Sequence, residues 1–143
     1  MKALALEAVG DARTPREKVA RLLRFTRAYI RPRVDAMGLQ LLDLLDRKSG
    51  DCKANALLFN TLARAVGVPA REVAGVAYMG DDVMAFGGHV WNEVVLDGMW
   101  VPVDAPWHDL PMREVHLRRG PAESAVLLPK STTLRVLDVE MRE

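Results

Sequence analysis

Apolar residues recur every three or four positions in the first half of the chain, a spacing typical of amphipathic helices. The clearest pattern begins at Thr14-Pro15, where threonine can cap free N–H groups and proline suits the first helical position. Residues 1–14 show no such pattern and are expected to form a poorly defined N-terminal segment. The expected helices cover residues 15–30, 39–45 and 52–66.

From Ala70 onward the apolar period changes to two, which indicates strands. Because the helices come first and the strands follow, the expected fold class is α+β, with N-terminal helices packed on a mostly antiparallel sheet. The expected strands cover residues 73–78, 89–96, 99–103, 114–117 and 134–139.

Asp97-Gly98 lies between two of these strands and is a strong signal for a two-residue hairpin turn. The turn sets a register in which Trp91 faces Asp104. His89 shares a face with Trp91, because side chains alternate along a strand, so His89 and Asp104 become diagonal neighbours about 7–8 Å apart. Pro102 lacks a ladder N–H, so its strand should be an edge or should bulge.

The chain has 143 residues, half of them apolar and 27% charged, which suits a single domain over residues 1–143. The net charge of +1 gives no signal for nucleic acid or for an anionic membrane surface. No apolar run approaches the roughly 20 residues that span a bilayer. We expect a cytoplasmic location, since the start does not resemble a signal peptide, although a domain of a longer protein would look the same.

The single cysteine, Cys52, follows Gly50-Asp51 and begins the longest expected helix, with Asp51 as its N-cap. Free N–H groups and the positive end of the helix dipole stabilise a thiolate there, and the same N–H groups could hold an oxyanion. The alternative is that Cys52 is a small buried apolar residue. Position alone does not choose between the two.

A nucleophilic thiol needs a base, and the expected hairpin supplies one. A carboxylate beside a histidine fixes its tautomer and stabilises its charged form, so that the ring can accept a proton from a nearby thiol. Cys52, His89 and Asp104 together provide the three roles. Taken separately, His89 could be a half-buried strand residue and Asp104 a residue of the turn before Ala105.

Two sequence blocks, "GDCKANALLFNTLARAVGVPAREVAGV" and "GHVWNEVVLDGMWVPVDAPW", resemble the transglutaminase-like superfamily of bacterial and archaeal proteins. The resemblance covers roughly residues 16–140 and implies the papain-like cysteine-enzyme fold. It implies that Cys52 is the nucleophile, His89 the base and Asp104 the residue that orients the histidine.

The sequence departs from the pattern of this family in two places. Ala105-Pro106 follows the aspartate where many members have Pro-Thr, and no glutamine precedes the cysteine as a second oxyanion donor. No acidic cluster matches the calcium sites of the eukaryotic members, so no metal or other cofactor is expected.

These observations favour a cysteine-dependent acyl-transfer enzyme that acts on a peptide or protein substrate. The resemblance favours hydrolysis of peptide or amide bonds over protein cross-linking. Trp91 and Trp107 are the candidate substrate-binding residues, and core packing is the alternative role for both. Two other functions stay open: a catalytically silent peptide-binding module on the same fold, and a zinc site that joins Cys52 to His89, His108 or Asp104.

Two surface features carry weaker expectations. Four arginines lie on one face of the first long helix: Arg21, Arg24, Arg27 and Arg31. This face is either exposed to solvent or a docking site for an anionic partner. Residues 79–88 join two strands just before His89 and are expected to form a rim over the cleft.

Overall fold

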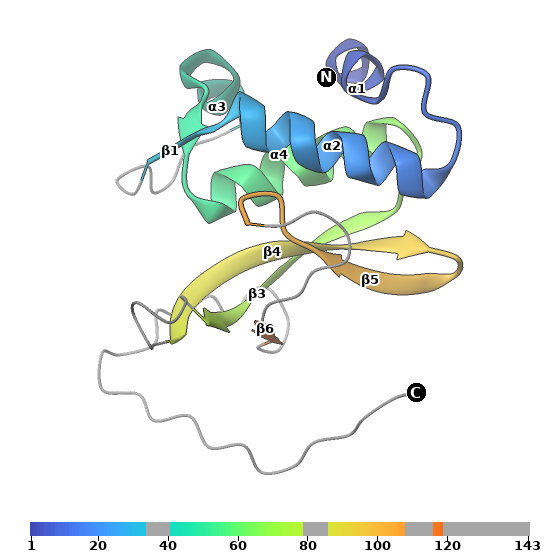
Figure 1. Cartoon of the computed structure of the whole chain (residues 1–143). Helices are drawn as coiled ribbons and strands as arrows, with labels where there is room; N and C mark the ends of the chain where they lie inside the picture. Colours follow the sequence, from blue (N-terminus) through green and yellow to red (C-terminus); the bar gives the residue numbers. More distant parts are fainter. Residues whose placement is uncertain (34–40, 79–85, 108–115, 119–143) are drawn as a thin grey trace.

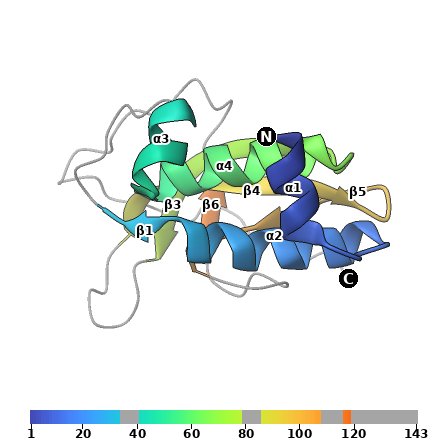
Figure 2. The same cartoon turned by 90° about the horizontal axis from the view of Figure 1, so that it is seen from above.

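Helices lie on one side of a four-stranded antiparallel sheet in the computed structural model of this chain (Figure 1). The structure describes residues 1–33, 41–78, 86–107 and 116–118. Seen from above, α2 and α4 lie side by side across the sheet and run in opposite directions (Figure 2). The predicted α+β class, with helices first and antiparallel strands after them, is confirmed.

The helices begin and end close to the positions that their capping residues predict. Thr14 accepts a hydrogen bond from the backbone of Glu17, whose carboxylate accepts one from the Thr14 N–H, so the start of α2 is a complete capping box. The four helices of the described residues are α1 Lys2–Val9, α2 Pro15–Tyr29, α3 Leu41–Arg47 and α4 Cys52–Ala65.

The strands form two sheets. A short parallel pair joins the end of α2 to the start of α4 and was not predicted: β1 Arg31–Pro32 and β2 Ser49–Gly50. The main sheet has the order β5-β4-β3-β6, and its members are β3 Ala70–Tyr78, β4 Phe86–Leu96, β5 Met99–Val103 and β6 His116–Arg118. The predicted strand over 134–139, most of the predicted rim over 79–88 and His108 lie outside the described residues.

The hairpin between β4 and β5 has the predicted turn and register. Asp97 and Gly98 have φ angles of 52° and 79°, as a two-residue turn with two left-handed positions requires. Leu96 pairs with Met99, and the pairing continues to Asn92 and Val103, one step before the predicted pair of Trp91 and Asp104. β5 is an edge strand, which accommodates Pro102.

The expectation for residues 1–14 was wrong, because α1 is a regular helix. Apolar residues lie on the exposed as well as the buried side of α1, because Leu6 is 54% exposed whereas Ala5 and Val9 are buried. The core contacts of Ala5 and Val9, and of the partly buried Leu4 and Ala8, stabilise this helix, and such contacts are not visible as a sequence period. Gly10 ends it with φ of 52°.

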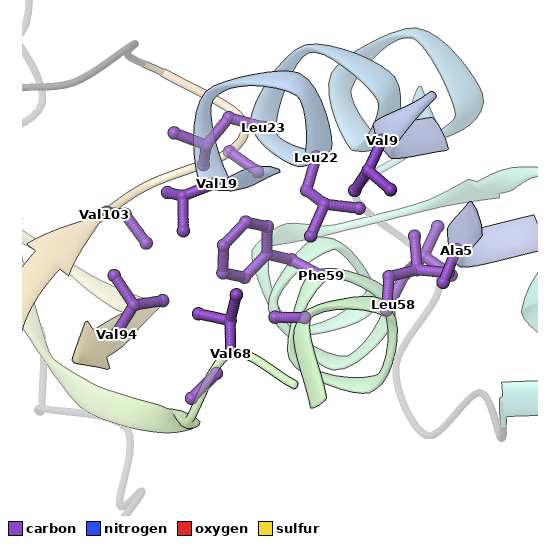
Figure 3. Close-up of a cluster of buried hydrophobic side chains, with 14 of the residues drawn as sticks. Ala5, Val9, Val19, Leu22, Leu23, Leu58, Phe59, Val68, Val94 and Val103 are labelled. Atoms are coloured by element: carbon purple, nitrogen blue, oxygen red, sulfur yellow. The ribbon is translucent and has the colours of Figure 1, made fainter. Parts of the chain in front are cut away.

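One hydrophobic cluster joins the helices to the sheet (Figure 3). Phe59 of α4 is fully buried and lies between α2 and the sheet, together with Leu22, Val94 and Val103. Burying a side chain of this size contributes about 2–3 kcal/mol. This packing holds the helix that begins at Cys52 against the hairpin that carries His89.

The hairpin turn can be tested by substitution at its tip. Gly98→Ala places a β-carbon at a left-handed position and should lower the free energy of unfolding by about 1–2 kcal/mol. Asp97→Asn is the matched control, because asparagine tolerates the left-handed region and should leave stability nearly unchanged. Urea denaturation measures both. Equal stability of the two variants would contradict the assigned turn.

Candidate active site

The backbone just before α4, the helix that begins at Cys52, has little room for a side chain. Gly50 is the last residue of β2, and a β-carbon added there would overlap the β-carbon of Ala54 and meet Leu44 Cδ1 at 3.4 Å. Its carbonyl accepts from the Arg33 N–H at 2.9 Å. Glycine therefore precedes Asp51 because the chain must pass close to the first turn of α4 before it reaches the cysteine.

Asp51 caps α4, as the sequence predicts. Its carboxylate accepts from the Ala54 N–H at 3.0 Å, and its carbonyl accepts from the Asn55 N–H and from the Asn55 side chain. Cys52 is the first residue of the helix and is partly exposed. The thiol thus lies at the positive end of a 14-residue helix and is accessible to small reagents.

His89 and Asp104 form a buried hydrogen-bonded pair. The distance between His89 Nε2 and Asp104 Oδ2 is 2.6 Å, and the two side chains are only 4% and 0% exposed. Water therefore does not compete for this contact. Since Nε2 faces the carboxylate, Nδ1 is the ring nitrogen left to exchange a proton with a thiol.

Cys52 interacts with the same imidazole. Burial alone would lower the pKa of His89, but hydrogen bonds to Asp104 and Cys52 outweigh it and raise the pKa from 6.5 to about 9. The ring is therefore largely protonated at neutral pH. A protonated ring between a carboxylate and a sulfur atom is the arrangement that stabilises a thiolate.

Two tryptophans flank the histidine ring. Trp107 stacks on it almost in parallel, with ring centroids 4.2 Å apart and planes 8° apart, and Trp91 lies farther away at 6.3 Å. Trp107 is half-buried, whereas Trp91 is only 3% exposed. Trp91 thus has little surface to offer a substrate, while Trp107 covers one face of the imidazole and restricts its rotation.

An arginine of α2 holds the turn that carries Asp104 and Trp107. Arg27 Nε donates to the Ala105 carbonyl at 3.0 Å, across 78 positions of sequence. This turn, orange in Figure 1, follows β5 and lies on the helix side of the sheet. Arg21 also binds within the chain, to the Val9 carbonyl and to Asp11. Arg24 donates to the Ala20 carbonyl of its own helix, so three of the four predicted face arginines have intramolecular partners.

The sequence anticipated the meeting of Cys52, His89 and Asp104, but not the parallel stack of Trp107 or the anchor at Arg27. The tryptophan was visible only as a possible cleft wall, and Arg27 looked the same as its neighbours in the arginine face. The described residues hold no cluster of three or more groups that could bind a metal ion. None of the described helices has the length and apolar content needed to cross a membrane.

Gly50→Ala tests the steric restriction before Cys52. The added methyl group must displace the first turn of α4, which we expect to lower the free energy of unfolding by about 1–3 kcal/mol. It should also slow the reaction of Cys52 with iodoacetamide. Gly67→Ala, at the other end of α4, has free space around the new methyl but φ of 80°, so it should destabilise without slowing Cys52. Unchanged stability and reactivity of Gly50→Ala would contradict the assigned clash.

The charged state of His89 predicts how stability depends on pH. The folded-state pKa of about 9 exceeds the unfolded value of 6.5, so the stabilisation is complete below pH 6.5 and is lost as pH rises through 9. The stability advantage of the wild type over His89→Gln should therefore shrink by roughly 1–3 kcal/mol between pH 6 and pH 9.5. Urea denaturation across this range measures it, and an advantage that grows with pH would refute the assignment.

Comparison with known proteins identifies the family of the chain. The family model described as the transglutaminase-like superfamily matches residues 2–105. None of the curated proteins matches the chain.

Several solved structures share the fold. A candidate cysteine protease from Cytophaga hutchinsonii superposes with a TM-score of 0.67 at 22% identity, over 82% of this chain and 40% of that one. The periplasmic domain of TgpA from Pseudomonas aeruginosa has a TM-score of 0.56 at 28% identity, over 74% and 41%. A candidate protease from Parabacteroides distasonis has 0.58 at 18% identity, over 73% and 22%.

The chain therefore spans less than half the length of each of these structures. The shared part is the helix-and-sheet core, and the family model covers the described residues from the first helix to the turn after β5. Since that model matches most of the sequence, the chain belongs to the transglutaminase-like superfamily.

Proposed function

We propose that this protein is a cysteine-dependent acyl-transfer enzyme that acts on peptide or amide bonds. The proposal depends above all on one observation, the buried hydrogen bond between His89 and Asp104 on a ring that also interacts with Cys52. A surface histidine would not need a buried carboxylate, and a buried carboxylate is costly unless it is paired. The pair is best explained as support for a charged imidazole next to a nucleophile.

The proposed reaction begins from an ion pair in which the Cys52 proton already resides on His89 Nδ1, so that the sulfur is a thiolate beside an imidazolium. The sulfur then attacks the substrate carbonyl carbon, which forms a C–S bond and moves an electron pair onto the oxygen. As the tetrahedral intermediate collapses, the C–N bond breaks and His89 protonates the leaving amine. Water, deprotonated by His89, then attacks the thioester, and the thiolate leaves. Asp104 orients the ring and stays ionised throughout.

Backbone groups of α4 are the proposed oxyanion donors. Asp51 already binds the N–H groups of Ala54 and Asn55, so the N–H groups of Cys52 and Lys53 are the two at the helix start that are left for a substrate oxygen. Such a pair would replace the glutamine that papain-like enzymes use. The proposal assigns the Cys52 N–H as the main donor, since it is nearest to the attacking sulfur.

Trp107 is the proposed wall of the substrate cleft, because it is half-buried beside the reacting ring. Trp91 is too buried to share that role. Hydrolysis is proposed over amine transfer, in line with the neighbours described as candidate proteases. The cytoplasmic location stays a prediction, and the Pseudomonas neighbour is a periplasmic domain.

Labelling of the thiol tests the proposed chemistry. At pH 7, iodoacetamide should modify Cys52 at least about tenfold faster than it modifies glutathione, because an imidazolium holds the thiolate. Electrophilic peptide libraries should label the wild type and not Cys52→Ala. Asp104→Asn should lower the labelling rate on the order of 10²-fold or more, since the ring loses its charged partner.

Asp97→Asn is the matched control for Asp104→Asn, because it makes the same chemical change at the exposed tip of the same hairpin. Its labelling rate should equal that of the wild type. A Cys52 that reacts no faster than glutathione, or a Cys52→Ala protein that keeps full amidase activity, would refute the proposed enzyme. A protein that binds peptides without forming a thioester would instead be the silent binding module.

A further inference from the structure

We propose that Asn92 is a positioning residue that sets the distance between the thiol of Cys52 and the ring of His89. Asn92 Nδ2 donates to the Ala56 carbonyl at 3.0 Å, so the side chain links β4, which carries the histidine, directly to α4, which begins at the cysteine. This inference rests on the proposed function and names a residue outside the three reacting groups.

Along the chain, the bond lies a few residues from both proposed reacting residues. Asn92 is three residues after His89 on the strand, and Ala56 is four residues after Cys52, about one helical turn. A single contact therefore fixes the approach of the two elements one turn below the sulfur. Apart from the interaction of Cys52 with His89 itself, this helix and β4 share apolar core residues such as Phe59 and Val94, and apolar contacts have no preferred direction.

The burial of Asn92 is difficult to explain by stability alone. The residue is 1% exposed and shares its side of the strand with Val94 and Leu96, both of which are in the core. The Ala56 carbonyl lies within a continuous helix, where the backbone N–H of Asn60 normally satisfies it. A valine at this position would bury apolar surface and would leave that helical bond in place. The main contribution of the Asn92 amide is therefore the fixed direction of its hydrogen bond to the Ala56 carbonyl, and not free energy gained by burial.

Asn60 provides a matched control within the same core. It is also a buried asparagine, 7% exposed, and it lies on α4, two turns away from Cys52. Its Oδ1 has no hydrogen-bond partner among the described residues. Asn60→Val and Asn92→Val make the same chemical change at similar burial, but only the second removes a link between the thiol helix and the histidine strand.

The experiment measures three quantities for the wild type, Asn92→Val and Asn60→Val. They are the second-order rate of Cys52 alkylation by iodoacetamide at pH 7, the urea midpoint of unfolding, and the low-field proton NMR signal of His89 Nε2–H. Because small misplacements of reacting groups reduce rates strongly, Asn92→Val should alkylate roughly 10-fold more slowly or worse. Its unfolding midpoint should differ from the wild type no more than that of Asn60→Val, and its His89 signal should remain.

Asn92→Leu is the second variant in case the valine protein does not fold, because leucine is close to asparagine in size and shape and has no donor. It should show the same slower alkylation, and Asn92→Gln, which keeps the donors, should recover part of the rate. Wild-type alkylation by Asn92→Val and Asn92→Leu would overturn the inference and leave the proposed enzyme intact. An equal loss of rate in Asn60→Val, or loss of the His89 signal, would also overturn it. A wild-type rate no faster than glutathione would refute the proposed function itself.

Discussion

The packing of α4 against both α2 and the main sheet is the constraint on which the rest of this structure depends. Phe59 is fully buried at the centre of that contact, and residues from α2, β4 and β5 surround it. The first residue of α4 is the only cysteine of the chain. Because the helix cannot shift far along the sheet without opening the core, the sulfur stays beside the strand of the histidine.

Burial also gives His89 and Asp104 their chemical character. In water, a histidine and an aspartate on adjacent strands would interact weakly, because the solvent screens both charges. Here both side chains are inaccessible, the hydrogen bond is 2.6 Å long, and the pKa of the ring rises to about 9. Burying a charged pair costs free energy. The pairing keeps the ring charged beside the proposed nucleophile.

The site is also supported from outside the reacting groups. Arg27 reaches from α2 to the carbonyl that follows Asp104, and Trp107 lies flat on the imidazole from the same turn. Asp104 is past the last paired residue of β5, so strand pairing alone does not hold it. The hydrogen bond from Arg27 to the Ala105 carbonyl and the stacking of Trp107 on the imidazole hold the turn of Asp104 in place. Part of the predicted arginine face thus belongs to the internal architecture of the site.

Local sequence signals were sufficient for the helices that have caps and for the hairpin. Thr14-Pro15, Asp51 and Asp97-Gly98 act through bonds to their near neighbours, and the hairpin register extends by simple alternation to His89 and Asp104. This is why the three proposed reacting residues could be named from the sequence. The same local rules could not find α1, because apolar residues occur on its exposed as well as its buried side and only its contacts with the core show which side is buried.

The links from Asn92 to Ala56 and from Arg27 to Ala105 were likewise beyond reach of the sequence, since they join positions 36 and 78 residues apart. Such contacts depend on how whole elements dock, and no short-range spacing records that. One trace of them was visible: an asparagine stood among apolar residues on the core side of its strand, where a polar group must find a partner. The sequence could name the proposed reacting groups, whereas only the packed chain shows which contacts hold their elements together.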